Sequence, residues 1–291
     1  MTVIHDLPFA EYQQIQAMNP STLVHGRKSM RSLKNAINGR SKEPTNAMRF
    51  GNKYHTLILE PEEFEKSFSV MPNYAAMPEN VTGKGERSDS WATVFCKESK
   101  RSFESATELD GKQVITRDEY DRGLAMCESI ADDEYASFII RTSKREVTLT
   151  GEIEGISFKG RLDLCGGILA DLKGTANAEA IAFGRTAANM KYAFKMSIYQ
   201  ELYRQNFEAY PDDVCIIAVE TGGDFECCVY DQMDAALDAG WDQVIATVRA
   251  YKGCIASDRW PGVNRGRGSV PLFVPNWAMP EDDLEVMYVP E

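Results

Sequence analysis

Hydrophobic and polar positions follow a helical period through most of the first half of the 291-residue chain. The segment 7–39 predicts helices that end at Gly39, and a further helix is predicted over residues 46–59. Residues 72–91 are rich in Pro, Gly, Asn and Ser and lack periodicity, so we expect a long loop there. Helical spacing returns over residues 116–140, behind an acidic first turn.

The pattern changes to a period of two over residues 145–174, which predicts three or four antiparallel strands joined by tight turns. The predicted breaks fall at Gly151, Gly155, Gly166 and Gly167. A helix over about 191–207, two strands within 213–230 and a long amphipathic helix over 233–256 follow. This order predicts an α/β or α+β fold with a mixed β-sheet.

The composition is that of a globular protein, because hydrophobic residues make up 43% of the chain, enough for a packed core. No apolar run of about 18 residues occurs, and the N-terminal sequence lacks the order of a secretory signal. We therefore expect a cytoplasmic location and no membrane contact. Seven cysteines without a C-x-x-C pair argue against a disulfide framework, a zinc ribbon or an iron–sulfur cluster, and we expect most of them in the core.

The net charge of −12 disfavours a nucleic-acid partner, because neutralisation of phosphates by Lys and Arg supplies much of that affinity. However, the positive charge is clustered in two basic islands, residues 25–42 and 264–268. A local basic channel can coexist with an acidic exterior. The composition therefore leaves a nucleic-acid partner open.

Acidic residues interrupt two of the predicted strands. Asp163 lies within one strand and Asp171 closes the next, so antiparallel pairing can bring both carboxylates to one end of the sheet, with Lys173 on the same side as Asp171. Carboxylate oxygens suit Mg²⁺, and an adjacent ammonium can orient a water and offset the charge on an attacked phosphate. The alternative is that both aspartates flank turns and that Lys173 is solvated.

Two other helices could complete such a site. His55 lies on the predicted helix 46–59, which could cover the end of the sheet, although a lone histidine is more often structural than a ligand. Tyr199 and Lys195 lie one turn apart on the predicted helix 191–207, as a substrate-facing edge requires. An aromatic residue at this spacing is otherwise a core residue.

Four segments of the sequence occur in an order that is specific as a set, although each is weak by itself. They read "GNKYHTLILEPEEFEKSFSVMP", "REVTLTG…GISFKGRLDL…ADLKGT", "YAFKMSIYQELY" and "RWPGV…PLFVPNWA". Together they resemble the phage and prophage exonucleases of the RecE (exonuclease VIII) group, within the PD-(D/E)xK nuclease superfamily. The resemblance implies one nuclease domain over residues 1–291, with a mainly helical N-terminal extension over 1–145. A restriction-endonuclease-like core, with a central mixed sheet flanked by helices, is implied over 146–291.

The resemblance implies roles for the matching residues. His55, Asp163, Asp171 and the main-chain carbonyl of Leu172 match the Mg²⁺ ligands of the family, with Mn²⁺ as a substitute. Lys173 matches the lysine that assists the attacking water. Glu146 matches the acidic residue that opens the meander, and Tyr199 matches the tyrosine that usually follows a glutamine by four residues. These roles make Lys173, Asp171, Asp163, Glu146 and Tyr199 the candidate catalytic residues.

The candidate DNA-binding residues are Ser21, Arg27, Lys28, Arg161 and Lys195. Lys195 departs from the family pattern, which has a glutamine there, and it could still contact a phosphate. Arg161 belongs to the R-x-D strand. Ser21, Arg27 and Lys28 lie where the family pattern places a DNA-end contact, and a helix cap and a solvated face are an equal alternative for them.

By resemblance, the function is exonucleolytic hydrolysis of linear double-stranded DNA from the 5′ end. The products are 3′ overhangs for recombination with a RecT-like strand-annealing protein. Relatives assemble as rings around DNA, so a homotrimer or homotetramer is implied. Three alternatives remain: a RecB- or Cas4-like nuclease of other polarity, a catalytically idle DNA-end-binding protein, and a purely structural interaction protein, which solvated acidic hairpins would favour. Cas4-like enzymes often carry an iron–sulfur cluster, for which the cysteine spacing is unsuitable.

Overall fold

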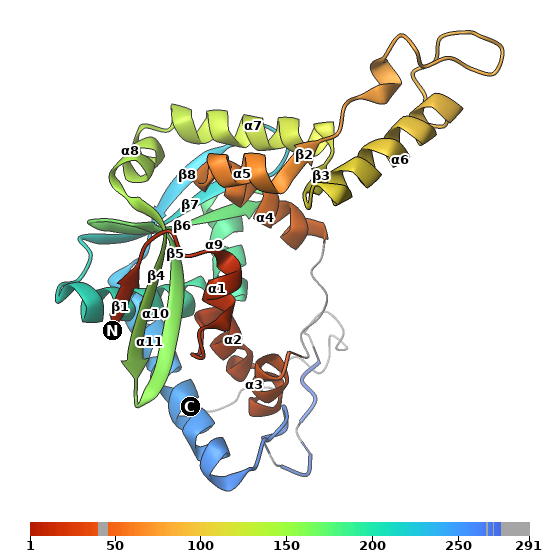
Figure 1. The fold of residues 1–291 in the computed structure, drawn as a ribbon. Helices are drawn as coiled ribbons and strands as arrows, with labels where there is room; N and C mark the ends of the chain where they lie inside the picture. Colours follow the sequence, from red (N-terminus) through yellow and green to blue (C-terminus); the bar gives the residue numbers. More distant parts are fainter. Residues whose placement is uncertain (40–45, 266, 270, 275–291) are drawn as a thin grey trace, which may run out of the picture.

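The computed structural model describes residues 1–39, 46–265, 267–269 and 271–274, and of residues 46–48 the backbone. Within this part of the chain, six strands form one sheet in the order β1-β4-β5-β6-β7-β8 (Figure 1). The strands are β1 (Thr2–Ile4), β4 (Lys144–Ile153), β5 (Ile156–Cys165), β6 (Ile168–Thr175), β7 (Asp213–Glu220) and β8 (Cys227–Asp231). The β6–β7 pair is parallel and the other pairs are antiparallel, which confirms the predicted mixed sheet.

Helices cover both faces of the sheet and supply the crossover that a parallel pair requires. They are α1 (Phe9–Gln14), α2 (Pro20–Leu23), α3 (Met30–Ile37), α4 (Asn46–Leu59), α5 (Pro61–Ser67), α6 (Val94–Leu109), α7 (Arg117–Asp132), α8 (Glu134–Thr142), α9 (Ala180–Met190), α10 (Tyr192–Phe207) and α11 (Asp234–Ser257). Short 3₁₀ turns are η1 (Val24–Arg27) and η2 (Tyr74–Ala76). The chain crosses from β6 to β7 through α9 and α10.

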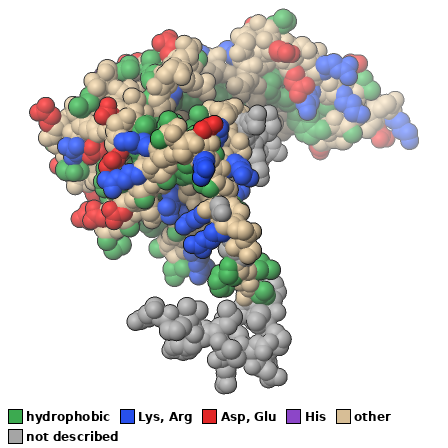
Figure 2. All heavy atoms as spheres, turned by 90° about the horizontal axis from the view of Figure 1, so that it is seen from below, with side chains coloured by type: hydrophobic (Ala, Val, Ile, Leu, Met, Phe, Trp, Pro, Cys, Tyr) green, Lys and Arg blue, Asp and Glu red, His purple; other side chains and the backbone are tan. Residues whose placement is uncertain are grey.

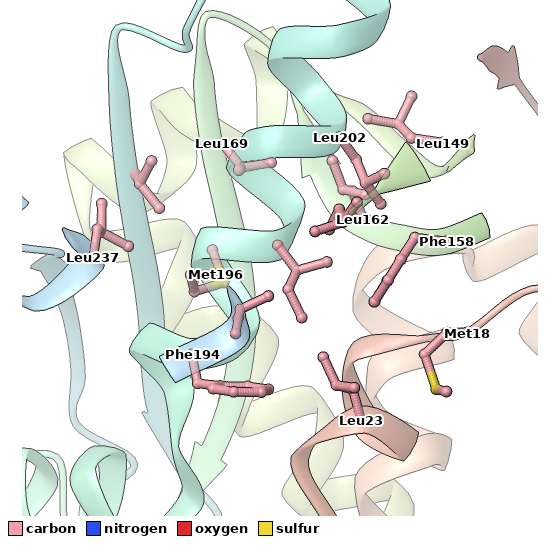
Figure 3. Packing of buried hydrophobic residues seen from close by; sticks show 14 of the residues in the cluster. Met18, Leu23, Leu149, Phe158, Leu162, Leu169, Phe194, Met196, Leu202 and Leu237 are labelled. Carbon is pink, nitrogen blue, oxygen red and sulfur yellow. The ribbon is translucent and has the colours of Figure 1, made fainter. Parts of the chain in front are cut away.

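One hydrophobic core joins α2, α3, α10 and α11 to β4 and β5 (Figure 3). Phe158 and Leu162 of β5 pack there with Phe194 and Leu202 of α10, and each such side chain stabilises the fold by about 1.5–3 kcal/mol when fully buried. Gly160 allows this close approach, since a Cβ at that position would lie 2.9 Å from the Tyr199 ring. On the other face, α4, α7 and α8 pack on β5, β6 and β7.

An arm projects from the body between the short parallel strands β2 (Phe68–Val70) and β3 (Gln113–Ile115) (Figure 1). It consists of η2, the long loop predicted over residues 72–91, and α6. The buried side chain of Asn80 organises the loop, because its amide donates to the carbonyls of Ala75, Ser88 and Ser90. The predicted loop is therefore confirmed, and its path is fixed by one buried amide.

Some predicted boundaries were wrong. The predicted helix 116–140 divides at Asp133, which caps α8 by accepting a hydrogen bond from the Ala136 N–H at 2.7 Å. The helical segment 7–39 is interrupted after α1. Gly151 lies inside β4, opposite Phe158, rather than at a turn. A Cβ there would lie 2.8 Å from Leu202, so this glycine serves packing.

All seven cysteines lie within the described residues and are free thiols. Cys96, Cys165, Cys215 and Cys254 are buried, and the others are partly buried, as expected of core residues. Among the described helices, none combines the length and the apolar character that a bilayer crossing requires.

Candidate active site

Three adjacent strands place three acidic residues in one row across the sheet. The β4–β5 register sets Glu146 opposite Asp163, although the two do not pair through the backbone. The last β5–β6 pair joins Leu164 to Ala170, so Asp163 comes next in line opposite Asp171. The spacing of the two aspartates in the sequence therefore brings both to one point of the sheet, as predicted.

The sheet opens at this point because β5 and β6 stop pairing. In place of a backbone pair, the Leu172 N–H donates to Asp163 Oδ2 at 2.8 Å. On the opposite side, Leu172 stays in register with Ile217 of β7. β6 therefore stays in the sheet through its pairing with β7. On its β5 side, a carboxylate replaces the backbone hydrogen-bond partner.

Glu146 sits at a distortion of β4. Its φ of 51° lies in the left-handed region, which costs a non-glycine residue about 1–2 kcal/mol. The distortion turns the carboxylate toward two cations. Oε2 pairs with Arg161 Nε, and Oε1 lies 3.6 Å from His55 Nδ1. An outlier of this kind is typical of a functional site.

His55 reaches the row from α4. Its Nε2 lies 3.1 Å from Asp163 Oδ2 and 3.0 Å from the Leu172 carbonyl oxygen. The predicted helix 46–59 has the bounds of α4, so the histidine covers the end of the sheet as expected. The structure thus brings together three of the four groups that match the family's ligands, with Asp171, the fourth, beside Asp163.

Lys173 lies on the same side of β6 as Asp171. Its Nζ is 2.5 Å from Asp171 Oδ2, 3.6 Å from Asp163 Oδ2 and 3.0 Å from the Leu172 carbonyl oxygen. The alternative of turn-flanking aspartates and a solvated lysine is therefore wrong. Both carboxylates are buried, and the ammonium is largely shielded from solvent.

The crowded charges shift the pKa values of the aspartates in opposite directions. Burial raises the pKa of Asp163, but His55 and Lys173 outweigh burial and leave that pKa far below its usual value. Burial and the negative charge of Asp163 raise the pKa of Asp171 to about 6. Two neighbouring carboxylates that differ in this way are typical of sites that transfer protons or hold cations.

The cations of the site are held in their charged forms. Burial lowers the pKa of His55, but the Asp163 carboxylate outweighs burial and raises it to about 10. Burial likewise opposes the charged form of Lys173, yet Asp171 and Asp163 raise its pKa above the usual value. In the absence of a bound cation, His55 and Lys173 therefore neutralise the buried carboxylates.

Tyr199 and Lys195 approach the row from α10. Burial and the charges of Asp171 and Asp163 hold the pKa of Tyr199 well above its usual value, so its phenol stays protonated. Burial lowers the pKa of Lys195, and the Asp171 carboxylate partly offsets this effect. Both α10 residues are therefore close enough to sense the charge of the aspartates.

An open cleft of about 1380 Å³ gives access to the site. Its lining includes His55, Glu146, Asp163 and Tyr199, and one wall is the N-terminal segment 5–9. A cleft of this size admits a polymer end or a small ligand.

Arg161 joins the N-terminal wall to the site. Its Nη1 donates to the Leu7 carbonyl at 2.6 Å, its Nε pairs with Glu146, and its Nη2 lies 3.3 Å from Glu60 Oε1. The side chain is 12% exposed. The guanidinium predicted to contact DNA is therefore engaged by protein groups, and it positions Glu146.

The remaining candidate DNA contacts lie elsewhere. Ser21 is an exposed residue of α2, whose cap is Asn19 rather than Ser21. Arg27 and Lys28 are exposed and do not line the cleft. Residues 40–42 of the first basic island, residue 266 of the second, residue 270, and the motif residues from 275 onward lie outside the described residues.

The comparison with protein families decides the identity of this arrangement. The family model described as a "PDDEXK-like domain of unknown function (DUF3799)" matches residues 20–266. The chain belongs to this PDDEXK-like family. The predicted membership of the PD-(D/E)xK superfamily is thereby confirmed.

One solved structure agrees on the fold of this PDDEXK-like protein. The crystal structure of a "putative exonuclease" from Eubacterium rectale is 14% identical, with 94% of this chain and 97% of that chain covered and a TM-score of 0.59. A structure of the protein SSO0001 is 12% identical and covers 67% of this chain and 85% of that chain, but its TM-score of 0.26 supports no argument. No curated protein matches the sequence.

The donor atoms suit the divalent cation that PDDEXK nucleases usually use. His55 Nε2 lies within 3.0–3.1 Å of both Asp163 Oδ2 and the Leu172 carbonyl oxygen. Two ligands at right angles around Mg²⁺, each about 2.0–2.1 Å away, would be about 3.0 Å apart. Glu146 adds a further carboxylate oxygen, within 4.8 Å of the ligand atoms of His55 and Asp163. The residues present therefore fit a hard divalent cation.

The sequence interpretation missed two supports of the site. The Tyr54 hydroxyl accepts a hydrogen bond from the Gly174 N–H, and burial raises the pKa of this tyrosine to about 12. A Cβ on Gly174 would lie 2.6 Å from that hydroxyl. Glu60 steadies Arg161 from the end of α4. Tyr54 precedes His55 in the sequence, and a second polar residue beside the candidate ligand was the available signal.

Proposed function

We propose that the protein is a Mg²⁺-dependent exodeoxyribonuclease that hydrolyses linear double-stranded DNA. One observation carries the proposal: Glu146, Asp163 and Asp171 form one row across the open edge of the sheet, with His55 and Lys173 against them. Like charges are buried together at a cost, and a cation-binding catalytic site explains that cost. The family membership supports a nuclease, and the cleft beside the row offers access for a DNA end.

In this proposal His55, Asp163, Asp171 and the Leu172 carbonyl hold the cation, with Mn²⁺ as a substitute for Mg²⁺. A divalent cation supplies Lewis acidity and a lowered pKa of water for attack on phosphorus. The Lys173 ammonium, which lies between the two aspartates, orients the attacking water and offsets the charge that develops on the phosphate. Glu146 holds His55 in place through the contact at Nδ1.

Residues on α10 contact the substrate in this proposal. The protonated phenol of Tyr199 is a hydrogen-bond donor for a phosphate oxygen at the cleft. Lys195, one turn away and beside the aspartates, supplies a second positive charge. Tyr199 lines the cleft, and Lys195 forms no ion pair with a described residue, while its Nζ lies 5.6 Å from the centre of the Tyr192 ring.

The finer properties are proposed from the motif resemblance to the RecE group. Digestion proceeds from the 5′ end and leaves 3′ overhangs for a RecT-like annealing protein, in recombination of phage or prophage DNA. A ring-shaped homotrimer or homotetramer encloses the duplex. A ring also explains the charge of −12, because cations need line only the inner surface.

The test compares wild type with Asp171→Ala on linear duplex, in Mg²⁺ and in EDTA. Separate labels at the 5′ and 3′ ends report polarity, and a closed circular duplex is the control for endonuclease cleavage. We expect mononucleotide release from the linear substrate by wild type in Mg²⁺, and its loss in EDTA and in the variant, with DNA binding retained. Equal release by wild type and variant would contradict the site assignment. Binding without release by wild type would favour an idle DNA-end-binding protein.

A further inference from the structure

The segment 258–261, which directly precedes the second basic island, contacts the first basic island, more than two hundred residues earlier in the sequence. The Arg31 N–H of α3 donates to the Pro261 carbonyl at 3.0 Å. Lys34 Nζ lies 4.8 Å from the centre of the Trp260 ring and 3.3 Å from Asp258 Oδ1. The chain after α11 is therefore fastened along α3 by a backbone bond, a cation–π contact and an ion pair.

Two wider segments around these contacts, residues 19–39 and 259–274, contain no Asp or Glu, although the whole chain has 44 of these residues. We call their exposed cations the basic face, and they are Arg27, Lys28, Arg31, Arg259, Arg265 and Arg267. None of these six cations forms an ion pair with another described residue, in contrast to Lys34. Figure 2, which views the molecule from below, shows Lys and Arg side chains gathered on this side.

The basic face lies beyond α1 as seen from the active-site cleft. Phe9 and Tyr12 of α1 line that cleft. The residues after Tyr12 line a second groove, which Ala36 and Ile37 of α3 close on the other side. Figure 1 shows α1, α2 and α3 in succession along one side of the molecule. Polymer that leaves the cleft past α1 would reach the basic face next.

We propose that the basic face binds the phosphate backbone of the duplex that extends behind the DNA end in the cleft. This inference rests on the proposed function, because it assumes a DNA end at the row of carboxylates. Exposed, unpaired guanidinium groups suit phosphates, and their binding releases condensed counterions without reading sequence. The acidic remainder of the surface repels the duplex from other faces and confines it to this path.

The test measures duplex binding in EDTA, where turnover plays no part, over a series of salt concentrations. The variant Arg31→Gln/Arg265→Gln/Arg267→Gln removes three cations of the basic face. Each phosphate contact contributes about 0.9 to the slope of log K against log salt, so we expect the slope to become shallower by about 2 to 3. At about 0.1 M salt this change corresponds to binding that is roughly 100- to 1000-fold weaker.

A matched control, Lys97→Gln/Arg101→Gln/Arg141→Gln, removes three exposed cations of α6 and α8 that form no ion pair with a described residue. It should keep the wild-type slope. If the first variant is poorly folded by circular dichroism, the pair Arg27→Gln/Lys28→Gln replaces it, with an expected change of about 1 to 2. A wild-type slope in the variants of the basic face, or an equal loss in the control, would overturn the proposal.

The two proposals fail separately. If wild type releases nucleotides in Mg²⁺ while the basic-face variant keeps the wild-type salt dependence of duplex binding, the nuclease proposal stands and the proposal for the basic face is wrong. If the salt dependence becomes shallower in the variant while wild type releases no nucleotides, the basic face binds DNA and the nuclease proposal is wrong.

Discussion

Two clusters among the described residues bring three possible ligand atoms within 4.8 Å of one another. The first joins His55, Glu146 and Asp163 at the open edge between β5 and β6. The second joins Asp213, Cys215 and Asp231 on β7 and β8, where the Cys215 thiol donates to Asp231 Oδ1 at 3.3 Å. The distances between ligand atoms do not distinguish the two clusters.

Their surroundings do distinguish them. Lys173 and Arg161 accompany the first cluster, which lines a cleft, whereas Asp213 and Asp231 form no ion pair with a described residue. Burial and the hydrogen bond to Asp231 raise the pKa of Cys215 well above its usual value, which keeps the thiol protonated and makes it a poor metal ligand. Charge balance and an access path, rather than close ligand atoms, therefore distinguish the proposed active site from the second cluster.

The largest expected difference between the clusters comes from Asp163→Asn. The amide still accepts from the Leu172 N–H, but it loses the charge that holds the cation and balances Lys173. A loss of several kcal/mol of transition-state stabilisation predicts nucleotide release about 10³-fold slower. Single-turnover assays on linear duplex measure this effect, with DNA binding as the control. A rate near that of wild type would remove Asp163 from the site.

The next effect concerns stability. Arg161→Gln leaves the Glu146 carboxylate buried without its partner and releases the N-terminal wall at Leu7. Breaking a buried pair in this way predicts a free energy of unfolding lower by about 3 kcal/mol. Urea denaturation measures it. Arg249→Gln is the matched control, because its pair with Glu154 is exposed, and we expect no measurable change there.

A smaller effect should appear in the pH dependence of the metal-free protein. The pKa of His55 is raised from 6.5 to about 10, so the folded state holds this proton more tightly than the unfolded state. The resulting stabilisation is fully present below pH 6.5 and declines as the pH rises toward 10. Thermal unfolding in EDTA across this range should show the decline, and His55→Gln should flatten it. An unchanged profile in His55→Gln would assign the dependence to other groups.

The smallest effect is expected at the second cluster. Asp231→Asn makes the same chemical change as Asp163→Asn, at an exposed residue that lines no part of the active-site cleft. We predict nucleotide release and Mg²⁺ affinity within about two-fold of wild type, as for most surface substitutions. Isothermal titration with Mg²⁺ checks the affinity. A large loss of nucleotide release or of Mg²⁺ affinity would show that the distances between ligand atoms, rather than charge balance, identify a cation site.

The sequence predicted the site better than its supports. Asp163, Asp171 and Lys173 could be placed because a period of two fixes which side chains share a face of a sheet. His55 could be placed because α4 has a clear helical pattern with Pro61 behind it. Local periodicity was sufficient for these residues.

Long-range partners could not be predicted in this way. Arg161 carries the positive charge expected of a DNA contact. Its partners Leu7 and Glu60, however, lie about a hundred residues or more away along the chain. The sequence interpretation also left α5, α6 and α9 unassigned, although α6 is about as amphipathic as α4. Tertiary contacts decide the partner of a charge.

The bond between the Leu172 N–H and the Asp163 carboxylate gives the molecule a reporter of its own. That amide proton is protected from exchange by the same oxygen that a cation would recruit. Occupancy of the site should therefore change the deuterium uptake of one backbone position in β6, without any substrate. Mass spectrometry of the corresponding peptide could then follow cation binding in the absence of DNA.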